Sequence, residues 1–299
     1  YSTLTKLARG YELRMKDGTL YEFTSVPFTD KNAASVVWFL TRIVDRNLNE
    51  TRFFYDENWN LTSVVAPSGD TTRLEYSFRT RDQFNTNKYN LDRIIASSGA
   101  IWSFEHDVEG WLISETNPLG DKTRYECDSV NRLTRIIYPD GSTQGYEYDS
   151  QGRTAKVLRN GEVQVSYVYG DRNSPVFTTI NALGRASTYK MSREGLLLES
   201  MDPLGNKTKY SYDGKYNLIQ TVDSKGNVSS FEYDAKGNLL KSTDPLGEIT
   251  TYTYEPVFHQ VTSQMDALGN IRRFTYDSKG NVIQSLDPAG NARDFTYDL

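Results

Sequence analysis

Few side chains in this sequence have the types and spacing that catalysis requires. The two histidines, His106 and His259, lie far apart in the chain, and Cys127 is the only cysteine. A thiol becomes a nucleophile when a neighbouring base or cation lowers its pKa. The sequence contains no HExxH, GxSxG, phosphate-binding loop or CxxC pattern. It therefore predicts no catalytic residues and no enzymatic activity, and a hydrolase is the least favoured function.

Aspartates recur at the starts of short turns, and oxygen-rich loops of this kind can bind calcium. Neither the EF-hand spacing nor a GGxGxD nonapeptide is present, however. An aspartate that opens a turn also has a structural task, because its carboxylate accepts hydrogen bonds from the backbone N–H groups that follow. We therefore expect no metal site and no other cofactor.

Four tryptophans lie in the first 111 residues: Trp38, Trp59, Trp102 and Trp111. Exposed aromatic rings could form a platform for sugars. Alternatively, these rings pack against neighbouring strands, as large aromatic side chains commonly do. Both interpretations stay open at the level of sequence.

The composition excludes several classes of protein. The 299 residues carry a net charge of −5, with 34 basic and 39 acidic residues interspersed, so no basic stripe for nucleic acid is present. No apolar run reaches the roughly 18 residues of a membrane-spanning helix, and we expect no membrane insertion. Only 37% of residues are hydrophobic, and 21 of the 299 are tyrosine. This composition favours solvent-exposed β-sheets over one large hydrophobic core. The chain opens YSTLTKLARG with no apolar leader, and we expect a piece of a longer protein.

One turn motif repeats with a period of 21 or 22 residues. Its first residue is Asp at 202, 223, 244, 266 and 287, and Asp-Pro-Leu-Gly is its commonest form. Proline presets φ at the second position, and glycine at the fourth accepts the left-handed conformation that closes a type I turn with a bulge. The structural residues of this motif include Asp202, Gly205, Asp244, Gly247, Asp266, Gly269, Asp287 and Gly290.

A second turn lies between successive copies of the first. It follows an aromatic-x-Tyr-Asp pattern, and its structural residues include Tyr148, Asp149, Tyr212, Asp213, Tyr233, Asp234, Tyr276 and Asp277. Each repeat therefore contains two strands of about six residues joined by two turns.

This repeat predicts an all-β chain of tandem antiparallel hairpins, with the two kinds of turn on opposite edges of one sheet. We expect a single array over residues 1–299, open at both ends, with insertions near 24–37 and 79–90 that would hold any helix. Aromatic residues two apart lie on one face, and we expect them to stack as a ladder across neighbouring strands. Gly247→Val would strain its turn.

The two motifs in phase resemble the YD-repeat, or RHS-repeat, family over roughly residues 40–299. The resemblance implies a ribbon of hairpins that spirals into a hollow shell, found in bacterial secreted or cell-surface proteins and in polymorphic toxins. In such toxins the shell encloses a C-terminal toxic domain. The chain departs from the pattern at His106, Cys127 and Met191, which occupy the tyrosine position.

We therefore expect a non-enzymatic shell or scaffold segment that encapsulates or presents a C-terminal toxin or effector. Its partners would be neighbouring repeats and an enclosed toxin domain or a surface glycan or protein, but not nucleic acid. The alternative is a cell-surface adhesion module that binds glycan or protein through its aromatic sheet faces.

Overall fold

The computed structural model describes residues 2–8, 10–15, 17–26, 37–81, 87–170 and 175–297. All regular structure in these ranges is β, and no helix occurs in them. The expected all-β fold is confirmed. Most of the predicted insertion near 24–37, and the middle of the one near 79–90, lie outside the described residues.

The sheet is a continuous antiparallel meander in which each strand pairs with the next one in sequence. Its strands are β1 Thr3–Leu7, β2 Gly10–Arg14, β3 Leu20–Val26, β4 Val37–Val44, β5 Glu50–Tyr55, β6 Leu61–Val65, β7 Thr71–Arg81, β8 Asn87–Ile95, β9 Ile101–His106, β10 Leu112–Thr116, β11 Lys122–Cys127, β12 Leu133–Ile137, β13 Thr143–Tyr148, β14 Thr154–Arg159, β15 Glu162–Tyr169, β16 Val176–Asn181, β17 Ala186–Met191, β18 Leu197–Met201, β19 Lys207–Tyr212, β20 Leu218–Val222, β21 Val228–Tyr233, β22 Leu239–Thr243, β23 Ile249–Tyr254, β24 Val261–Met265, β25 Ile271–Tyr276, β26 Val282–Leu286 and β27 Ala292–Asp294.

The two kinds of turn lie on opposite edges of this ribbon, as predicted. Turns of the Asp-x-x-Gly kind lead from an even-numbered strand to the next odd-numbered one, and we call their side the DxxG edge. Turns that follow the Tyr-Asp pattern lead from odd to even strands along the other side, the YD edge. Because consecutive strands run antiparallel, every second turn returns to the same edge.

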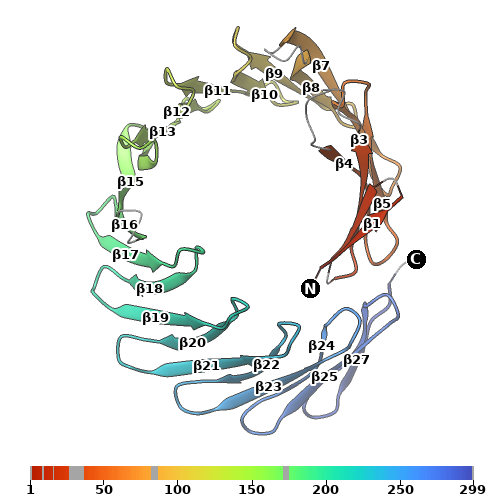
Figure 1. Cartoon of the computed structure of the whole chain (residues 1–299), viewed down its shortest axis with the longest axis vertical. Coiled ribbons are helices and arrows are strands. Elements are labelled where there is room, and N and C mark those ends of the chain that lie inside the picture. Colours follow the sequence, from red (N-terminus) through yellow and green to blue (C-terminus); the bar gives the residue numbers. More distant parts are fainter. Residues whose placement is uncertain are drawn as a thin grey trace.

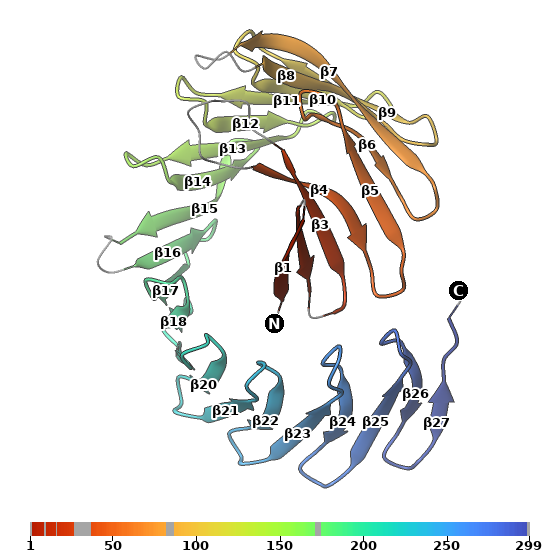
Figure 2. The ribbon, with the colours of Figure 1, turned by 45° about the vertical axis from the view of Figure 1, so that its right-hand side comes forward.

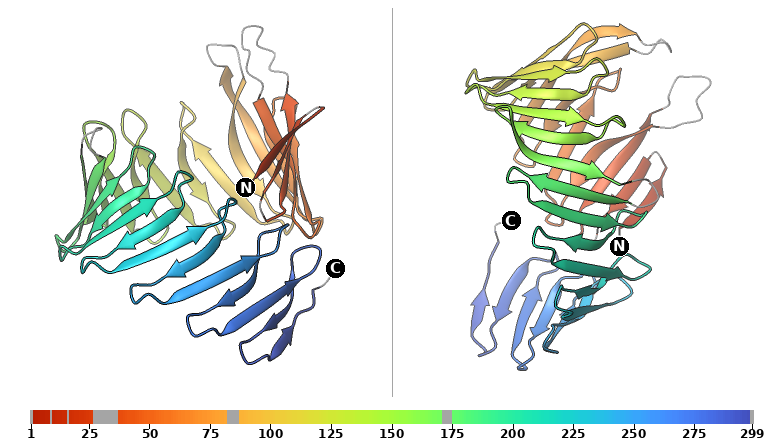
Figure 3. Two further views of the ribbon diagram at one scale, coloured as in Figure 1. Left: turned by 60° about the horizontal axis from the view of Figure 1, so that its bottom comes forward. Right: turned by 90° about the vertical axis from the view of Figure 1, so that its left-hand side faces the viewer.

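The ribbon curves through almost a full circle (Figure 1). The ring is not flat, because the last hairpins are displaced from the first along its axis (Figures 2 and 3). In most repeats a β-bulge interrupts the pairing beside the YD turn, for example between Ser211 and Tyr212 and between Glu232 and Tyr233. A bulge bends its strand and increases the local twist, so a bulge at the same place in each repeat contributes a similar bend each time.

The sheet is a single layer with little interior. Its solvent-accessible area is 19864 Å², whereas a compact monomer of 34.1 kDa would expose about 13,000 Å². No side chain of the described residues is fully buried. Cross-strand pairs supply part of the stability instead, such as Lys241–Glu232 at 2.8 Å and Lys156–Glu147 at 2.7 Å. Exposed pairs of this kind contribute up to about 1 kcal/mol each.

Tyrosines two apart share one face, but in the regular repeats they do not form the stacked ladder that the sequence predicted. In β19, Tyr210 and Tyr212 are both half-buried while Lys209 and Ser211 are exposed. The residue opposite Tyr210 is Thr221, however, and the one opposite Phe231 is Ser242. In these repeats the aromatic strands are two strands apart, roughly 10 Å, which is too far for ring stacking. Rings do stack across neighbouring strands at Phe177 and Tyr189, whose ring centres lie 4.9 Å apart.

Tyr216→Gly is expected to stabilise the hairpin formed by β19 and β20. Tyr216 occupies the glycine position of its turn at φ +68°, a conformation that costs a non-glycine residue roughly 1–2 kcal/mol. Glycine loses about 0.5–1 kcal/mol through its flexible unfolded state, so we expect a net gain of up to about 1 kcal/mol in the opening free energy measured by hydrogen exchange. Tyr216→Ala keeps the strained φ and serves as the control. An equal gain in both variants would mean that strain at this position is not the cause.

Candidate functional site

The tyrosine of each Tyr-Asp pair ties one repeat to the repeat before it. Its hydroxyl donates to a backbone carbonyl 15 residues earlier, as from Tyr148 to Leu133 at 2.6 Å and from Tyr276 to Val261 at 2.6 Å. The same bond recurs from Tyr55, Tyr76, Tyr169, Tyr212, Tyr254 and Tyr297. Burial raises the pKa of Tyr276 and of Tyr233, so these hydroxyls stay protonated at neutral pH. The tyrosine thus links adjacent hairpins through hydrogen bonding.

The aspartate of each pair closes its own turn. In the Tyr-Asp turn that begins at Asp213, Oδ1 accepts from the backbone N–H of Lys215 at 2.8 Å and of Asn217 at 2.9 Å, and Oδ2 accepts from the Asn217 side-chain amide at 2.9 Å. Asp234 and Asp277 accept the same three hydrogen bonds. One carboxylate therefore holds three donors of a five-residue turn.

Arginine takes the place of the fifth-position asparagine in two YD turns. Arg153 donates from Nε to Asp149 at 2.8 Å, and its guanidinium lies 4.3 Å from the ring centre of Tyr169 in the next repeat. Arg132 lies in the same way 4.6 Å over the Tyr148 ring. A cation over an aromatic face adds attraction, so arginine here both closes the turn and contacts the neighbouring repeat.

The DxxG turns use the same hydrogen bonds. Asp202 and Asp266 each bind two backbone N–H groups and one asparagine amide. Asp287 accepts from the N–H and the side-chain amide of Asn291. Asp244 accepts from the N–H of Leu246 at 2.9 Å and of Glu248 at 2.8 Å. The amide bond is missing in this turn because the fifth residue is glutamate instead of asparagine.

The glycines of these turns are required by conformation, not by space. Gly205, Gly247, Gly269 and Gly290 have φ between +82° and +86°. A Cβ built on any of them would have no atom within 4 Å. The backbone N–H of each glycine donates to the carbonyl of the aspartate that opens the turn.

Acid should loosen the array by protonating the turn carboxylates. The asparagine amide, followed by the backbone N–H groups, lowers the pKa of Asp202, Asp223, Asp266 and Asp287 in the folded chain. A lowered folded pKa contributes stability above the unfolded value of about 3.9, and that stability is lost as pH falls through the folded pKa. We therefore expect circular dichroism to show loss of the sheet below about pH 4.

Asn270→Ala tests the cause of this acid sensitivity. It removes the donor to Asp266 Oδ2 but leaves the two backbone donors in place. The pKa of Asp266 should rise, and NMR titration of its carboxyl carbon should show this. An unchanged titration would contradict the role assigned to the amide.

The histidines and the cysteine are not brought together. His106 ends β9, Cys127 ends β11 with an exposed thiol, and His259 lies in the turn between β23 and β24. The Nδ1 atom of His259 lies 3.5 Å from the Asn238 side-chain amide. No group of three or more potential metal ligands occurs among the described residues. The same residues contain no helix long and apolar enough to cross a membrane.

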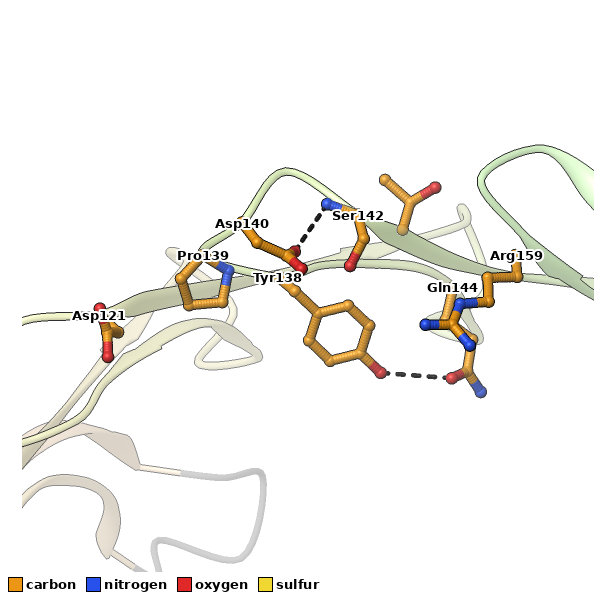
Figure 4. A pocket seen from close by; sticks show the side chains of 8 residues that line it. Asp121, Tyr138, Pro139, Asp140, Ser142, Gln144 and Arg159 are labelled. Atoms are coloured by element: carbon orange, nitrogen blue, oxygen red, sulfur yellow. Dashed lines mark hydrogen bonds between the residues drawn. The ribbon is translucent and has the colours of Figure 1, made fainter.

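A shallow polar depression lies on the DxxG edge around the turn between β12 and β13 (Figure 4). Tyr138 donates its hydroxyl to Gln144 Oε1 at 3.2 Å, and the Ser142 N–H donates to Asp140 Oδ1 at 2.8 Å. Arg159 lines the same depression. These groups can hydrogen-bond a polar ligand, but none of them forms a pair of nucleophile and base.

The structure also contains a contact that the sequence did not predict. The Phe258 ring packs between two glycines: a Cβ built on Gly18 would lie 2.6 Å from Phe258 Cε1, and one built on Gly280 would lie 2.7 Å from Cδ2. Beside it, the Asn281 amide donates to Asn47 Oδ1 at 3.0 Å. Asn281 and Gly280 are buried, although most turn residues are exposed. We call this set of residues the winding contact.

The winding contact joins the DxxG edge of the first hairpins to the YD edge of the last ones. We call one full revolution of the ribbon a winding. One winding runs from β5 to β25, because the turn before β5 meets the turn after β25. A sequence signal for it exists: the turn Glu255–Gln260 has one residue more than the regular YD turns such as Asp213–Asn217, and its closing bond runs from Glu255 N to Gln260 O. This extra residue accounts for the 22-residue spacing between Asp244 and Asp266.

A single-layer meander of similar hairpins, in which aspartate opens many turns and a Tyr-Asp pair recurs along one edge, defines a β-hairpin repeat protein. The sequence profile of the RHS Repeat matches residues 106–143, 192–228, 233–262 and 256–292. RHS repeats therefore occur along the chain between residues 106 and 292.

Solved structures give a weak global match. The crystal structure of TcdB2-TccC3 without its hypervariable C-terminal region aligns with a TM-score of 0.44 at 12% sequence identity. The Photorhabdus luminescens Tc holotoxin pore aligns with a TM-score of 0.37 at 13% identity. In both cases 93% of this chain matches 22% of the other chain, so this chain spans about a fifth of their length. Among curated proteins, none matches.

Proposed function

We propose that this chain is a non-enzymatic wall segment of a shell that encloses or presents a C-terminal toxin or effector, as part of a secreted or cell-surface bacterial protein. We further propose that residues 1–299 form one array and that the Tyr, Asp and Gly residues of its turns serve as structural residues. The match of four segments to the RHS repeat supports a structural scaffold. The polar groups of the turn residues form hydrogen bonds with their own backbone and with neighbouring repeats, which supports a structural role for them.

The winding contact is the observation that carries the enclosing role. A ribbon that merely presents a surface needs only its hairpin-to-hairpin pairing. Here the YD edge of the last hairpins lies against the DxxG edge of the first, at Asn281 and Asn47 and at Phe258 and Gly18. Contact between successive windings turns a ribbon into a continuous wall, which can separate an inside from an outside.

Protease protection tests this role. The full reading frame that encodes the chain would be expressed with its native sequence and with Phe258→Ala, which weakens the wall at the winding contact. We expect a segment beyond the array that resists protease in the native protein and is digested in the variant. Equal digestion in both, or a reading frame without such a segment, would contradict enclosure.

The aromatic residues of the first hairpins favour adhesion as the second candidate. Trp111 is 48% exposed and Trp59 is 39% exposed, so both could contact a sugar face. Trp59 already stacks on Phe39, however, with ring centres 5.1 Å apart. Titration with chitohexaose or cellohexaose should leave tryptophan fluorescence unchanged if the chain is a wall, whereas a saturable change would support adhesion.

A further inference from the structure

The winding contact shows which residues of the DxxG edge face a neighbouring winding. In the turn that begins at Asp45, the third residue is Asn47, and its side chain accepts the hydrogen bond from Asn281. In the turn that begins at Met15, the fourth residue, Gly18, lies against Phe258. The tips of DxxG turns are thus the points at which one winding touches the next.

The DxxG edge beyond these first turns carries leucine at the same third position. Leu204, Leu246 and Leu268 are 86%, 85% and 87% exposed. We call these side chains, together with the exposed Leu119 and Leu183 of other DxxG turns, the leucine row. No described segment of the chain covers them. Such large apolar side chains, repeated along one edge, indicate an interaction surface.

The YD edge of the early hairpins is the other uncovered edge. It carries Val108, which is 92% exposed, and Val130, which is 65% exposed. Exposed Glu57 and Glu109 lie on the same stretch, and Lys225 occupies the leucine position in one turn of the leucine row. Both uncovered edges therefore present exposed apolar side chains at the tips of their turns.

We propose that the leucine row on the DxxG edge binds a second copy of this chain, so that copies stack head to tail. The surface bound on the second copy is the YD edge around Val108 and Val130, which we call the early YD edge. The contact continues the winding contact, which already joins a DxxG edge to a YD edge. A head-to-tail contact leaves one edge of each type free at the ends of the stack, so association continues beyond dimers. This assembly does not depend on whether the array encloses a payload.

Two variants, one for each edge, test the proposal by sedimentation velocity under reducing conditions. L204K/L246K changes the leucine row, and the turn beginning at Asp223 already carries Lys225 at this position. V108K/V130K changes the early YD edge. All four side chains are exposed, so the folds should persist, and circular dichroism checks this. V168K changes an exposed valine within β15, outside the turns of both edges, and serves as the control.

The native chain and V168K should associate as concentration rises, and each edge variant alone should have its association constant reduced at least about tenfold. An equal mixture of the two edge variants should form one-to-one dimers and stop there, because only one intact edge of each type remains. Three results would overturn the proposal. They are a native chain that stays monomeric, undiminished self-association of V108K/V130K alone, which indicates leucine row against leucine row, or undiminished association of L204K/L246K alone.

Discussion

Gly280→Val is expected to destabilise its hairpin more than Gly247→Val, although both glycines occupy the same position of similar turns. Both have the same φ of +83°, which costs a non-glycine residue roughly 1–2 kcal/mol and a β-branched residue more. Their surroundings differ. A Cβ on Gly247 meets nothing within 4 Å, whereas one on Gly280 lies 2.7 Å from the Phe258 ring. The clash should add roughly 1–3 kcal/mol.

Native-state hydrogen exchange measures this difference locally, which suits a repeat array that need not unfold in one step. In Gly247→Val, the amides of β22 and β23 should exchange faster. In Gly280→Val, the amides of β25 and β26 should exchange faster still, and those of β2 and β3 should follow because the winding contact is lost. Equal acceleration in the two variants, with β2 and β3 unaffected, would mean that Phe258 does not pack on Gly280.

The local structure could be predicted because it depends on interactions within a few residues. An aspartate followed three residues later by glycine specifies its own turn through the hydrogen bonds of one carboxylate and one positive φ. The turn that begins at Asp266 shows this: both backbone donors and the asparagine donor lie within four residues of it. Alternation of exposed and half-buried residues in β19 likewise follows from the geometry of a single strand.

Interactions between repeats were harder to predict. The expected aromatic ladder was wrong for the regular repeats, because in each of them a strand without aromatic residues on that face lies between two aromatic strands and places Thr221 opposite Tyr210. The hydrogen bond from Tyr254 to the Leu239 carbonyl joins β23 to the strand before it. No pattern of residue types alone indicates that a hydroxyl would reach a carbonyl 15 residues earlier.

The winding contact depends on curvature summed over many hairpins. A small error in the twist of each repeat would move the last hairpins far from the first, so sequence spacing alone cannot predict that Phe258 meets Gly18. The irregular turn EPVFHQ was visible in the sequence, and its glycine position is occupied by His259 at φ +56°. The sequence could show that this turn differs, but not what it contacts.

Phe258→Ala is expected to open the ring while leaving the hairpins intact. The half-buried ring contacts Gly18 and Gly280, and its loss should cost about 2 kcal/mol, half the value for a fully buried phenylalanine. That free energy corresponds to a roughly thirty-fold shift towards the open state. Spin labels at Ser68→Cys and Lys236→Cys, in a Cys127→Ser background, lie outside the contact and report the separation of the two windings. Their distance distribution should lengthen and broaden in Phe258→Ala, and Val257→Ala, which removes an exposed neighbour, should leave it unchanged.

A double-mutant cycle separates packing at this contact from backbone strain. Gly18→Ala carries two penalties: φ is +89°, and the new Cβ would lie 2.6 Å from Phe258 Cε1. The strain is the same whether or not Phe258 is present, but the clash disappears in Phe258→Ala. The double variant should therefore open the ring less than the sum of the two single variants, since residues in contact couple while distant ones add. Strict additivity would place Phe258 away from Gly18 and would remove the winding contact as the feature that closes the wall.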